Sequence, residues 1–232
     1  MKKRGISIFI ILLLSNLPFS PTLMAQEKKK ATTEEAPVPF YQGTAIGVDV
    51  FGIGSKLFGS SSTSTEVNIE VNLKNRFIPV VEIGYGEMNT TDDGTNIYYK
   101  AAAPYFRVGM NYNAMYKKPY LPGYLFVGFR LAHTSFSYDA VAPNMVDPTW
   151  GNVEVPFSYY GVKTNVTWME FLVGIKTKVY KNFCMGWTFR YRSRLSMKKA
   201  ENTEPTYIPG YGKNKSSIFG GITYSLIYNL PF

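Results

Sequence analysis

Strict alternation of apolar and polar residues constrains the fold of this 232-residue chain more than any other feature. In residues 65–74, TEVNIEVNLK, every second residue from Val67 to Leu73 is apolar and the residues between them are polar. A repeat of two residues places successive side chains on opposite faces of a strand, whereas a helix repeats every 3.6 residues. Eight segments contain this alternation: residues 44–50, 65–74, 81–86, 104–116, 125–134, 169–176, 185–194 and 222–232. The sequence therefore predicts an all-β protein.

The composition of the two strand faces distinguishes a membrane barrel from a soluble sandwich. The apolar face carries bulky Phe, Tyr, Trp and Met side chains, while the polar face is rich in Gly, Arg and Asn. A soluble sandwich would bury its large aromatics and solvate a face rich in Lys, Thr and Glu. An apolar exterior around a narrow polar lumen suits lipid, which also requires a closed sheet because open edges leave backbone groups unpaired. We therefore predict an eight-stranded antiparallel up-and-down transmembrane β-barrel.

The links between segments alternate in length, which indicates the orientation in the membrane. Links after the second, fourth and sixth segments are short, and the others are longer, above all residues 139–165. Bacterial barrels have short periplasmic turns and longer outer loops, so we expect both termini in the periplasm. An aromatic girdle is expected at the periplasmic rim. Its predicted members are Tyr112, Tyr116, Tyr124, Tyr180, Phe183, Tyr228 and Phe232.

The N-terminal residues predict export. Three basic residues precede an apolar stretch from Ile6 to Leu14, which is typical of a secretory signal peptide and is too short to span a bilayer as a helix. We assign residues 1–25 to the signal peptide, residues 26–40 to a flexible periplasmic tail, and residues 41–232 to the barrel. The tail is charged, contains proline and has no apolar face to bury.

Composition limits the chemistry that the chain can carry. Cys184 is the only cysteine, so no intrachain disulfide can form. The net charge of +9 and the aromatic content of 16% would also suit a nucleic-acid-binding protein, but an exported chain does not meet that ligand, and we expect no nucleic acid among its partners. We also expect no cofactor and no bound metal. Asp92 and Asp93 carry carboxylates that could bind Ca²⁺ weakly, but the sequence TTDDGTN favours an ordinary Asp-Gly turn.

Several motifs resemble an uncharacterised family of small outer-membrane β-barrels, a domain-of-unknown-function family of Gram-negative bacteria. They are NRFIPVVEIGYG, APYFRVGMNYNAMYKK, YLFVGFR, YKNFCMGWTFRYRSRLS and the terminal YNLPF, and the resemblance covers roughly residues 40–232. It implies a barrel in the outer membrane and supplies no activity or catalytic residue. The C-terminus also resembles the signal recognised by the barrel-assembly machinery, from which Pro231 departs. The predicted signal residues are Tyr224, Tyr228, Leu230 and Phe232.

An enzymatic alternative depends on the only histidine of the chain, His133. Ser135 and Asp139 share its strand face near the outer rim, so a catalytic triad that modifies membrane lipid can be imagined. The simpler interpretation is that His133 and Ser135 are polar residues at the point where the strand leaves the bilayer. We favour the simpler interpretation and expect no enzymatic activity.

Charged residues of the polar face are segregated, and the barrel brings them together. The second and third segments turn near Asn75, which gathers acids on one side of the lumen, while the sixth and seventh turn near Asn182, which gathers arginines on the other. In a ring of eight strands, the second faces the sixth and the third faces the seventh, so the two groups should pair across the lumen. We therefore expect a plugged barrel rather than a small channel. The predicted lumen network comprises Glu66, Glu70, Glu82, Arg107, Arg130, Glu170, Arg190, Arg192 and Arg194.

The outer loops leave the role of the protein open between several partners. Lysines that flank the last outer loop could meet lipopolysaccharide phosphates or merely keep the loop soluble: Lys198, Lys199, Lys213 and Lys215. The aromatic loop at 139–165 could dock on a protein partner or fold over its own barrel mouth. We predict a non-catalytic outer-membrane barrel, either structural or a binding subunit of a larger outer-membrane assembly. Its expected partners are outer-membrane lipid and lipopolysaccharide, the barrel-assembly machinery and a possible outer-membrane protein.

Overall fold

The computed structural model describes residues 39–50, 52, 54, 60–92, 94, 96–147, 153–198, 200 and 203–231. All of them belong to one compact unit, Val38–Phe232. The predicted signal peptide at 1–25, nearly all of the predicted tail at 26–40, and Phe232 lie outside these residues and stay predictions. Within the described part of the chain, no helix is long and apolar enough to cross a membrane.

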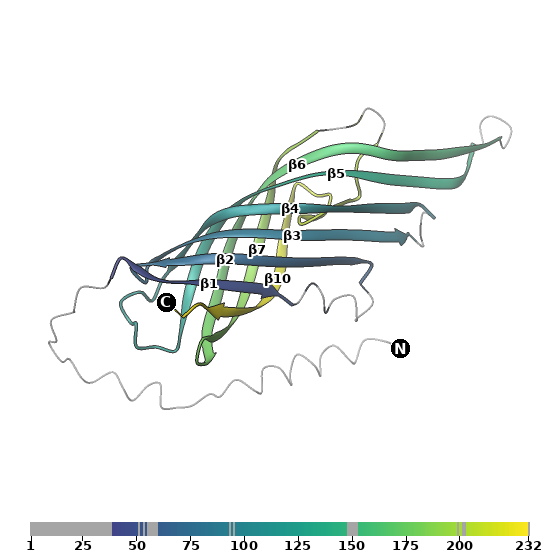
Figure 1. The fold of residues 1–232 in the computed structure, drawn as a ribbon. Helices are drawn as coiled ribbons and strands as arrows, with labels where there is room; N and C mark the ends of the chain where they lie inside the picture. Colours follow the sequence, from purple (N-terminus) through teal and green to yellow (C-terminus); the bar gives the residue numbers. More distant parts are fainter. Residues whose placement is uncertain are drawn as a thin grey trace. The chain divides into compact units, whose positions relative to one another are not determined.

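Eight antiparallel strands close into one ring, in the order β1-β10-β7-β6-β5-β4-β3-β2 (Figure 1). Each strand pairs with its neighbour in sequence, and β1 closes the ring by pairing with β10, from Ala45 opposite Asn229 to Asp49 opposite Ser225. The fold class is confirmed as an all-β, eight-stranded up-and-down barrel. The ring strands are β1 (Tyr41–Asp49), β2 (Ser62–Leu73), β3 (Phe77–Thr91), β4 (Tyr98–Asn113), β5 (Gly123–Asp147), β6 (Val153–Tyr180), β7 (Phe183–Met197) and β10 (Ser217–Asn229).

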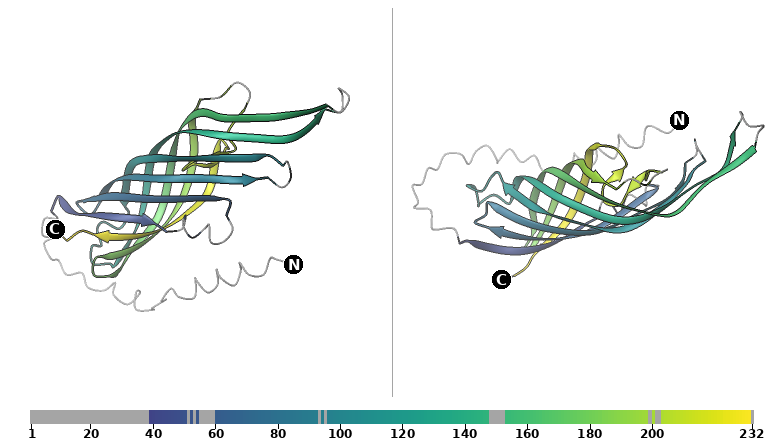
Figure 2. Two further views of the ribbon diagram at one scale, coloured as in Figure 1. Left: turned by 45° about the vertical axis from the view of Figure 1, so that its right-hand side comes forward. Right: turned by 90° about the horizontal axis from the view of Figure 1, so that it is seen from above.

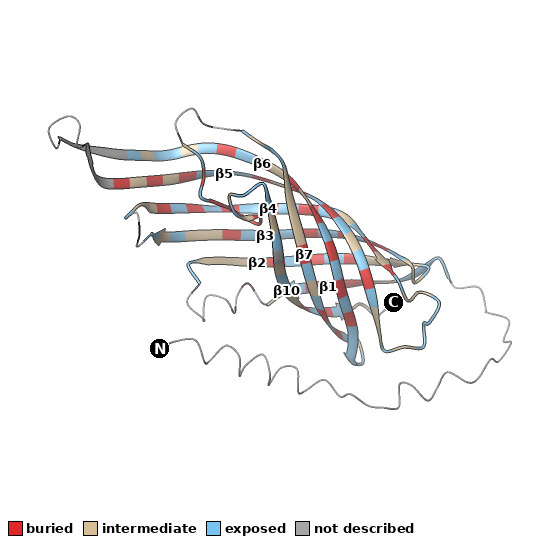
Figure 3. Ribbon diagram, turned by 180° about the vertical axis from the view of Figure 1, so that it is seen from behind, coloured by how far each residue is buried: buried red, intermediate tan, exposed pale blue. Residues whose placement is uncertain are grey.

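Burial alternates along the strands with the polar residues inside (Figure 3). In β3, Ile83 exposes 63% of its surface while the neighbouring Glu82 exposes only 2%. The same inversion holds for Ile69 and Val173, which are exposed, and for Glu66 and Glu170, which are buried. Burying carboxylates while exposing branched aliphatic side chains is the reverse of a water-soluble fold. The exterior is therefore the apolar face that the alternation predicted.

Short turns join the strands at one end of the ring. Lys74 and Asn75, between β2 and β3, have φ angles of 52° and 56°. Two successive residues with positive φ are typical of the tight type I′ hairpin, whose twist matches that of the strands. The links from β4 to β5, residues 114–122, and from β6 to β7, residues 181 and 182, lie at the same end, as do the start of β1 and the end of β10. The predicted alternation of short and long links does not hold throughout, because the β4–β5 link is longer than the links from β3 to β4 and from β5 to β6 at the opposite end.

The predicted long loop at 139–165 is wrong, because most of it is strand. β5 continues to Asp147 and β6 begins at Val153, and the two pair until Asp147 lies opposite Val153. This hairpin extends past the ends of its neighbours (Figures 1 and 2). Two register shifts, after Tyr138 and after Ala142, interrupt the alternation on β5. Backbone pairing therefore defines the hairpin where the side-chain pattern is broken.

The polar-lumen prediction holds for only part of the interior. Toward the end of the barrel where the β5–β6 hairpin extends, the interior is an apolar core. It is contributed mainly by β4, β5, β6 and the link between β7 and β10. This link contains a small hairpin, β8 (Tyr207–Ile208) paired with β9 (Gly212–Lys213). The larger aromatic members of the core are Tyr99, Tyr105, Phe136, Tyr138, Trp168, Tyr207 and Tyr211.

Candidate functional site

A layer of buried charges crosses the middle of the lumen. Six strands contribute to it, and inward parity on each strand directs the charged side chains to the same level. Glu170 has no exposed surface, and Arg107, Arg130 and Glu82 expose only 2% each. The layer, called the charge layer below, consists of Glu66 on β2, Glu82 on β3, Arg107 on β4, Arg130 on β5, Glu170 on β6, and Arg190 and Arg192 on β7.

Arg190 links opposite walls of the barrel. Its Nη2 lies 3.1 Å from Glu66 Oε1 on β2, and its Nη1 lies 3.0 Å from Glu82 Oε2 on β3. The same Nη1 lies 3.0 Å from Glu170 Oε2 on the adjacent β6. A single guanidinium therefore contacts three carboxylates, two of them across the lumen. Planar guanidinium groups suit such multiple contacts, because their donors form a rigid fork.

Arg107 and Arg130 complete the pairing of the acids. Arg107 forms ion pairs with Glu66 and, at 3.2 Å, with Glu82, and its Nε lies 3.0 Å from Glu170 Oε1. Arg130 Nε donates to Glu82 Oε1 over 2.9 Å. Each carboxylate thus contacts at least two arginines. Such pairing offsets the large cost of taking carboxylates out of water.

Two aromatic residues add hydrogen bonds to the same carboxylates. Trp168 Nε1 donates to Glu170 Oε1 over 2.7 Å, and the Tyr105 hydroxyl donates to Glu66 Oε2 over 3.1 Å. Tyr105 also lies against Gly84, where a Cβ would be 2.3 Å from the tyrosine ring. Glycine at this position therefore makes room for the ring that supports the charge layer.

A second ion pair lies between the charge layer and the short-turn end. Glu70, a predicted member of the network, pairs there with Lys176 on β6. Lys176 was not among the predicted site residues, although its inward parity could have revealed it. A cavity of about 270 Å³ opens next to this pair. Its polar lining includes Asn72, Asn75, Tyr124, Lys178 and Asn229.

Arg192 and Arg194 differ from the expectation that both lie beside Glu170. Arg192 is opposite Glu170 in the ladder, and its Nε lies 3.5 Å from Glu170 Oε1. Arg194 instead donates to Asn214 Oδ1 in the link between β7 and β10. Trp168 lies opposite Arg194 in the same register that places Glu170 opposite Arg192, so Arg194 is one step of the ladder beyond the acid on its face. Arg194 therefore belongs to the support of that link and not to the charge layer.

The β8–β9 hairpin packs inside the barrel above the charge layer. Arg107 Nη2 donates to Gly210 O, and Arg192 Nη1 donates to Tyr211 O, both over 2.9 Å. Gly210 has a φ of 78°, and a Cβ there would lie 2.4 Å from the Tyr105 ring, so the tip of the hairpin requires glycine. The same arginines thus pair with the acids and hold the hairpin by its backbone.

Aromatic side chains secure the rest of this hairpin. The Tyr99 hydroxyl donates to Tyr207 O over 2.7 Å, and the Trp168 and Tyr211 rings meet edge to face at 5.7 Å. Burial raises the pKa of Tyr207 to about 12, so its phenol stays protonated at neutral pH. Sequence reasoning missed the hairpin, because residues 203–216 contain neither alternation nor a repeat.

The residues of the enzymatic alternative have other partners. His133 Nδ1 lies 2.9 Å from Thr167 Oγ1, and Asp139 Oδ1 accepts a hydrogen bond from Gly161 N over 2.7 Å. Ser135 is exposed on the outer face of β5. In the described hydrogen bonds, His133 and Asp139 are therefore bonded neither to each other nor to Ser135, as a catalytic triad would require.

The acidic turn also has a structural explanation. Asp92 Oδ1 accepts a hydrogen bond from Gly94 N over 3.1 Å, as expected for an ordinary Asp-Gly turn, and Asp93 lies outside the described residues. Among the described residues, no group of three or more His, Cys, Asp or Glu side chains could hold a metal ion.

Some of the predicted girdle and C-terminal signal residues have contacts in the structure, while Phe232 lies outside the described residues. Phe183 and Tyr228 meet edge to face at 5.0 Å, and Tyr112 and Tyr116 do so at 6.1 Å. Tyr124 was expected in the girdle, but it lines the interior cavities because its parity on β5 is inward. The rings of Tyr224 and Trp187 meet at a tilt, with their centroids 4.6 Å apart, and Leu230 N donates to Thr44 O over 2.9 Å.

Comparison with known proteins identifies a family. Comparison with curated proteins finds no match. Among solved structures, the crystal structure of Neisserial surface protein A (NspA) is similar, at 12% identity and a TM-score of 0.42, covering 82% of this chain and 96% of that chain. The resemblance to a family of unknown function is confirmed: the family model described as Domain of unknown function (DUF6048) matches residues 3–232, and the chain belongs to this family.

Proposed function

We propose that the protein is a non-catalytic outer-membrane β-barrel with a closed lumen, both termini in the periplasm, and a role as a binding subunit of a larger outer-membrane assembly. The observation that carries this proposal is the inverted burial of the ring, with apolar side chains outside and paired charges inside. An exterior of this kind needs a lipid environment, and closure of the ring leaves no strand edge facing lipid.

The filled interior supports a binding or structural role over a channel. The charge layer spans the lumen, and the β8–β9 hairpin packs directly on it. An eight-stranded barrel has an interior just wide enough for its own side chains. We therefore expect no steady current from the protein in planar bilayers.

The β5–β6 hairpin supports the binding role. Described pairing of β4 with β5 ends at Val141, and described pairing of β6 with β7 begins at Val166. Beyond these points, the described pairs of the two strands are with each other only. A two-stranded ribbon is marginally stable alone, and a strand edge is a template for pairing with another chain. Tyr160 on this ribbon exposes 69% of its surface.

The lysines at the base of the last outer loop support contact with lipopolysaccharide. Lys198, Lys213 and Lys215 are exposed, and Lys199 lies outside the described residues. Their charge suits phosphate groups of the outer leaflet. Delivery by the barrel-assembly machinery is part of the same proposal, through the C-terminal residues predicted above.

Affinity purification from native membranes in mild detergent, followed by mass spectrometry, tests the binding role. The matched variant replaces residues 142–157 with a two-residue Asn-Gly turn between the paired Val141 and Ser158, which keeps the barrel and removes the outer part of the ribbon. A stoichiometric partner that copurifies with the unchanged protein and is lost with the shortened variant is the expected result. Absence of such a partner, or its retention by the shortened variant, would contradict the role of the hairpin.

A further inference from the structure

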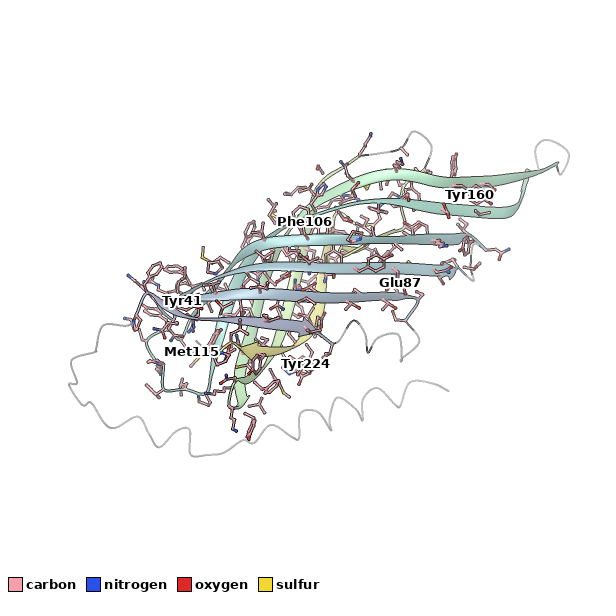
Figure 4. All side chains as sticks on the ribbon, viewed as in Figure 1. Tyr41, Glu87, Phe106, Met115, Tyr160 and Tyr224 are labelled. Carbon is pink, nitrogen blue, oxygen red and sulfur yellow. The ribbon has the colours of Figure 1, made fainter. Side chains whose placement is uncertain are left out.

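The short-turn end of the barrel carries basic residues without acidic ones. Six lysines and arginines lie in the described stretches 39–44, 72–78, 112–123, 177–184 and 228–231, and no aspartate or glutamate occurs in them. The group, called the basic rim below, consists of Lys74, Arg76, Lys117, Lys118, Lys178 and Lys181. Figure 4 shows Tyr41 and Met115 at this end and Glu87 and Tyr160 toward the other. Such a rim attracts anions.

Arg76 contacts more aromatic rings than any other residue of the basic rim. Its guanidinium lies over the rings of Phe77, Tyr112 and Tyr116, at 5.1, 5.3 and 4.7 Å from their centroids. Its backbone is held on both sides, because Arg76 N donates to Leu73 O over 3.0 Å and Arg76 O accepts from Asn113 N over 2.9 Å. Within the described part of the chain, no carboxylate pairs with this guanidinium.

An apolar groove of about 630 Å³ begins at two of the same rings. Phe77 lies opposite Tyr112, and Tyr112 lies opposite Val127, so these side chains form one row across β3, β4 and β5. The groove lies between this row and the next one toward the barrel centre. The members of the second row are Pro79, Met110, Phe129 and Phe171, which are also neighbours in the ladder.

We propose that Arg76 and this groove form a binding site for an anionic glycerophospholipid of the inner leaflet. The guanidinium binds the lipid phosphate by charge-assisted hydrogen bonds, and an acyl chain occupies the groove. Aromatic residues of membrane proteins concentrate at the headgroup level, which places Arg76 at the height of the phosphates. The choice of leaflet rests on the proposed periplasmic location of the short turns, whereas the site itself rests on the contacts described here.

The net charge of the basic rim determines the lipid class. A zwitterionic headgroup brings a cation as well as a phosphate to the surface, and the described rim offers no acid to receive that cation. An anionic headgroup is attracted by each lysine or arginine near the membrane surface. Phosphatidylglycerol is therefore expected to bind in preference to phosphatidylcholine.

Binding of the two lipids to the purified full-length mature protein in detergent micelles tests the proposal by native mass spectrometry. Phosphatidylglycerol should bind at least about tenfold more tightly than phosphatidylcholine, and Arg76→Gln should lower this preference, because the phosphate loses its fork of donors while the five lysines of the rim remain. Arg76→Lys should keep part of it, because the charge remains while the fork of donors is lost. Lys213→Gln, an equal change of charge at the opposite end, serves as the control and should leave the preference unchanged.

A groove variant separates the acyl-chain contact from the headgroup contact. Val127→Trp fills the groove without changing charge, and it should weaken the binding of both lipids while leaving their ratio unchanged. Equal binding of the two lipids to the unchanged protein, or an unaltered preference in Arg76→Gln, would refute the site. Tighter binding of lipid A than of phosphatidylglycerol would refute the assigned class. A separate experiment tests the leaflet: in an Asn182→Cys, Cys184→Ser variant, reaction of the new cysteine with a membrane-impermeant label on intact cells would refute the leaflet and the proposed orientation, independently of the micelle experiment.

Discussion

Replacement of Arg190 by methionine should destabilise the barrel far more than the same replacement of its neighbour on the strand, Arg192. Methionine keeps most of the length of the side chain and removes the charge. The change removes one partner from each of the buried carboxylates of Glu66, Glu82 and Glu170. Their oxygens lie 3.0 to 3.1 Å from the guanidinium nitrogens of Arg190. Removal of one member of a buried ion pair costs about 3–5 kcal/mol, and we expect a loss of unfolding free energy in this range.

Arg192→Met is the matched control for this prediction. Arg192 lies on the same strand two residues away, its side chain is 17% exposed, and it has one carboxylate contact at 3.5 Å. Its replacement should therefore cost only about 1–2 kcal/mol, mainly through the lost hydrogen bond to Tyr211 O. The two variants differ in the number of buried acids that they leave short of a partner, while the change in side-chain chemistry is the same.

Denaturant unfolding in detergent micelles, followed by tryptophan fluorescence, measures both losses. Trp168 is a suitable reporter, because its indole nitrogen is bonded to Glu170 within the charge layer. Glu82→Gln combined with Arg190→Met should lose less free energy than the sum of the two single changes, because the variants share one interaction. Equal losses for Arg190→Met and Arg192→Met, or additivity in the double variant, would refute the reasoning.

Three further predictions concern orientation, catalysis and the last link. In a Cys184→Ser background, a cysteine at Tyr160 should react with a membrane-impermeant label on intact cells, whereas one at Asn182 should react only after permeabilisation; the reverse pattern would overturn the orientation. His133→Ala should leave the lipid A acylation and phospholipid profiles unchanged, because no other histidine can act as a general base; a changed profile at normal protein abundance would support the enzyme alternative. Reversal of Arg192 and Arg194 to Glu should lower the temperature of heat unfolding in detergent. The variant loses the bonds to Tyr211 and Asn214 as well as the ion pair of Arg192. An unchanged unfolding temperature would contradict the supporting role of these arginines.

Residue parity along strands explains which parts of the structure could be predicted from the sequence. Because parity is set by backbone geometry alone, residues such as Ile83 and Glu82 are assigned to opposite faces without knowledge of their neighbours. Ring order then follows from the pairing of consecutive segments, which places β2 and β3 opposite β6 and β7. The contacts of Arg190 on β7 with Glu66 on β2 and Glu82 on β3 agree with this order. Lys176 could have been found by the same reasoning.

Other features depend on tertiary contacts that no local pattern encodes. The β8–β9 hairpin is buried only because Arg107, Arg192 and Tyr99 supply donors for its carbonyl groups. The placement of Arg194 likewise depends on its bond to Asn214, which lies in the link between β7 and β10. Whether the lumen is polar or apolar at a given height similarly depends on which link folds into it.

The reach of Arg190 along the chain has a consequence for how the barrel comes apart. Its guanidinium bonds to Glu66, 124 residues away, and to Glu82, 108 residues away, so the first and last quarters of the ring are tied together at one point. β2 and β3 cannot separate from β7 without breaking an ion pair that spans the lumen. Opening of one seam should consequently propagate to the whole ring. We expect a single cooperative transition, with all regions becoming accessible to protease at the same denaturant concentration.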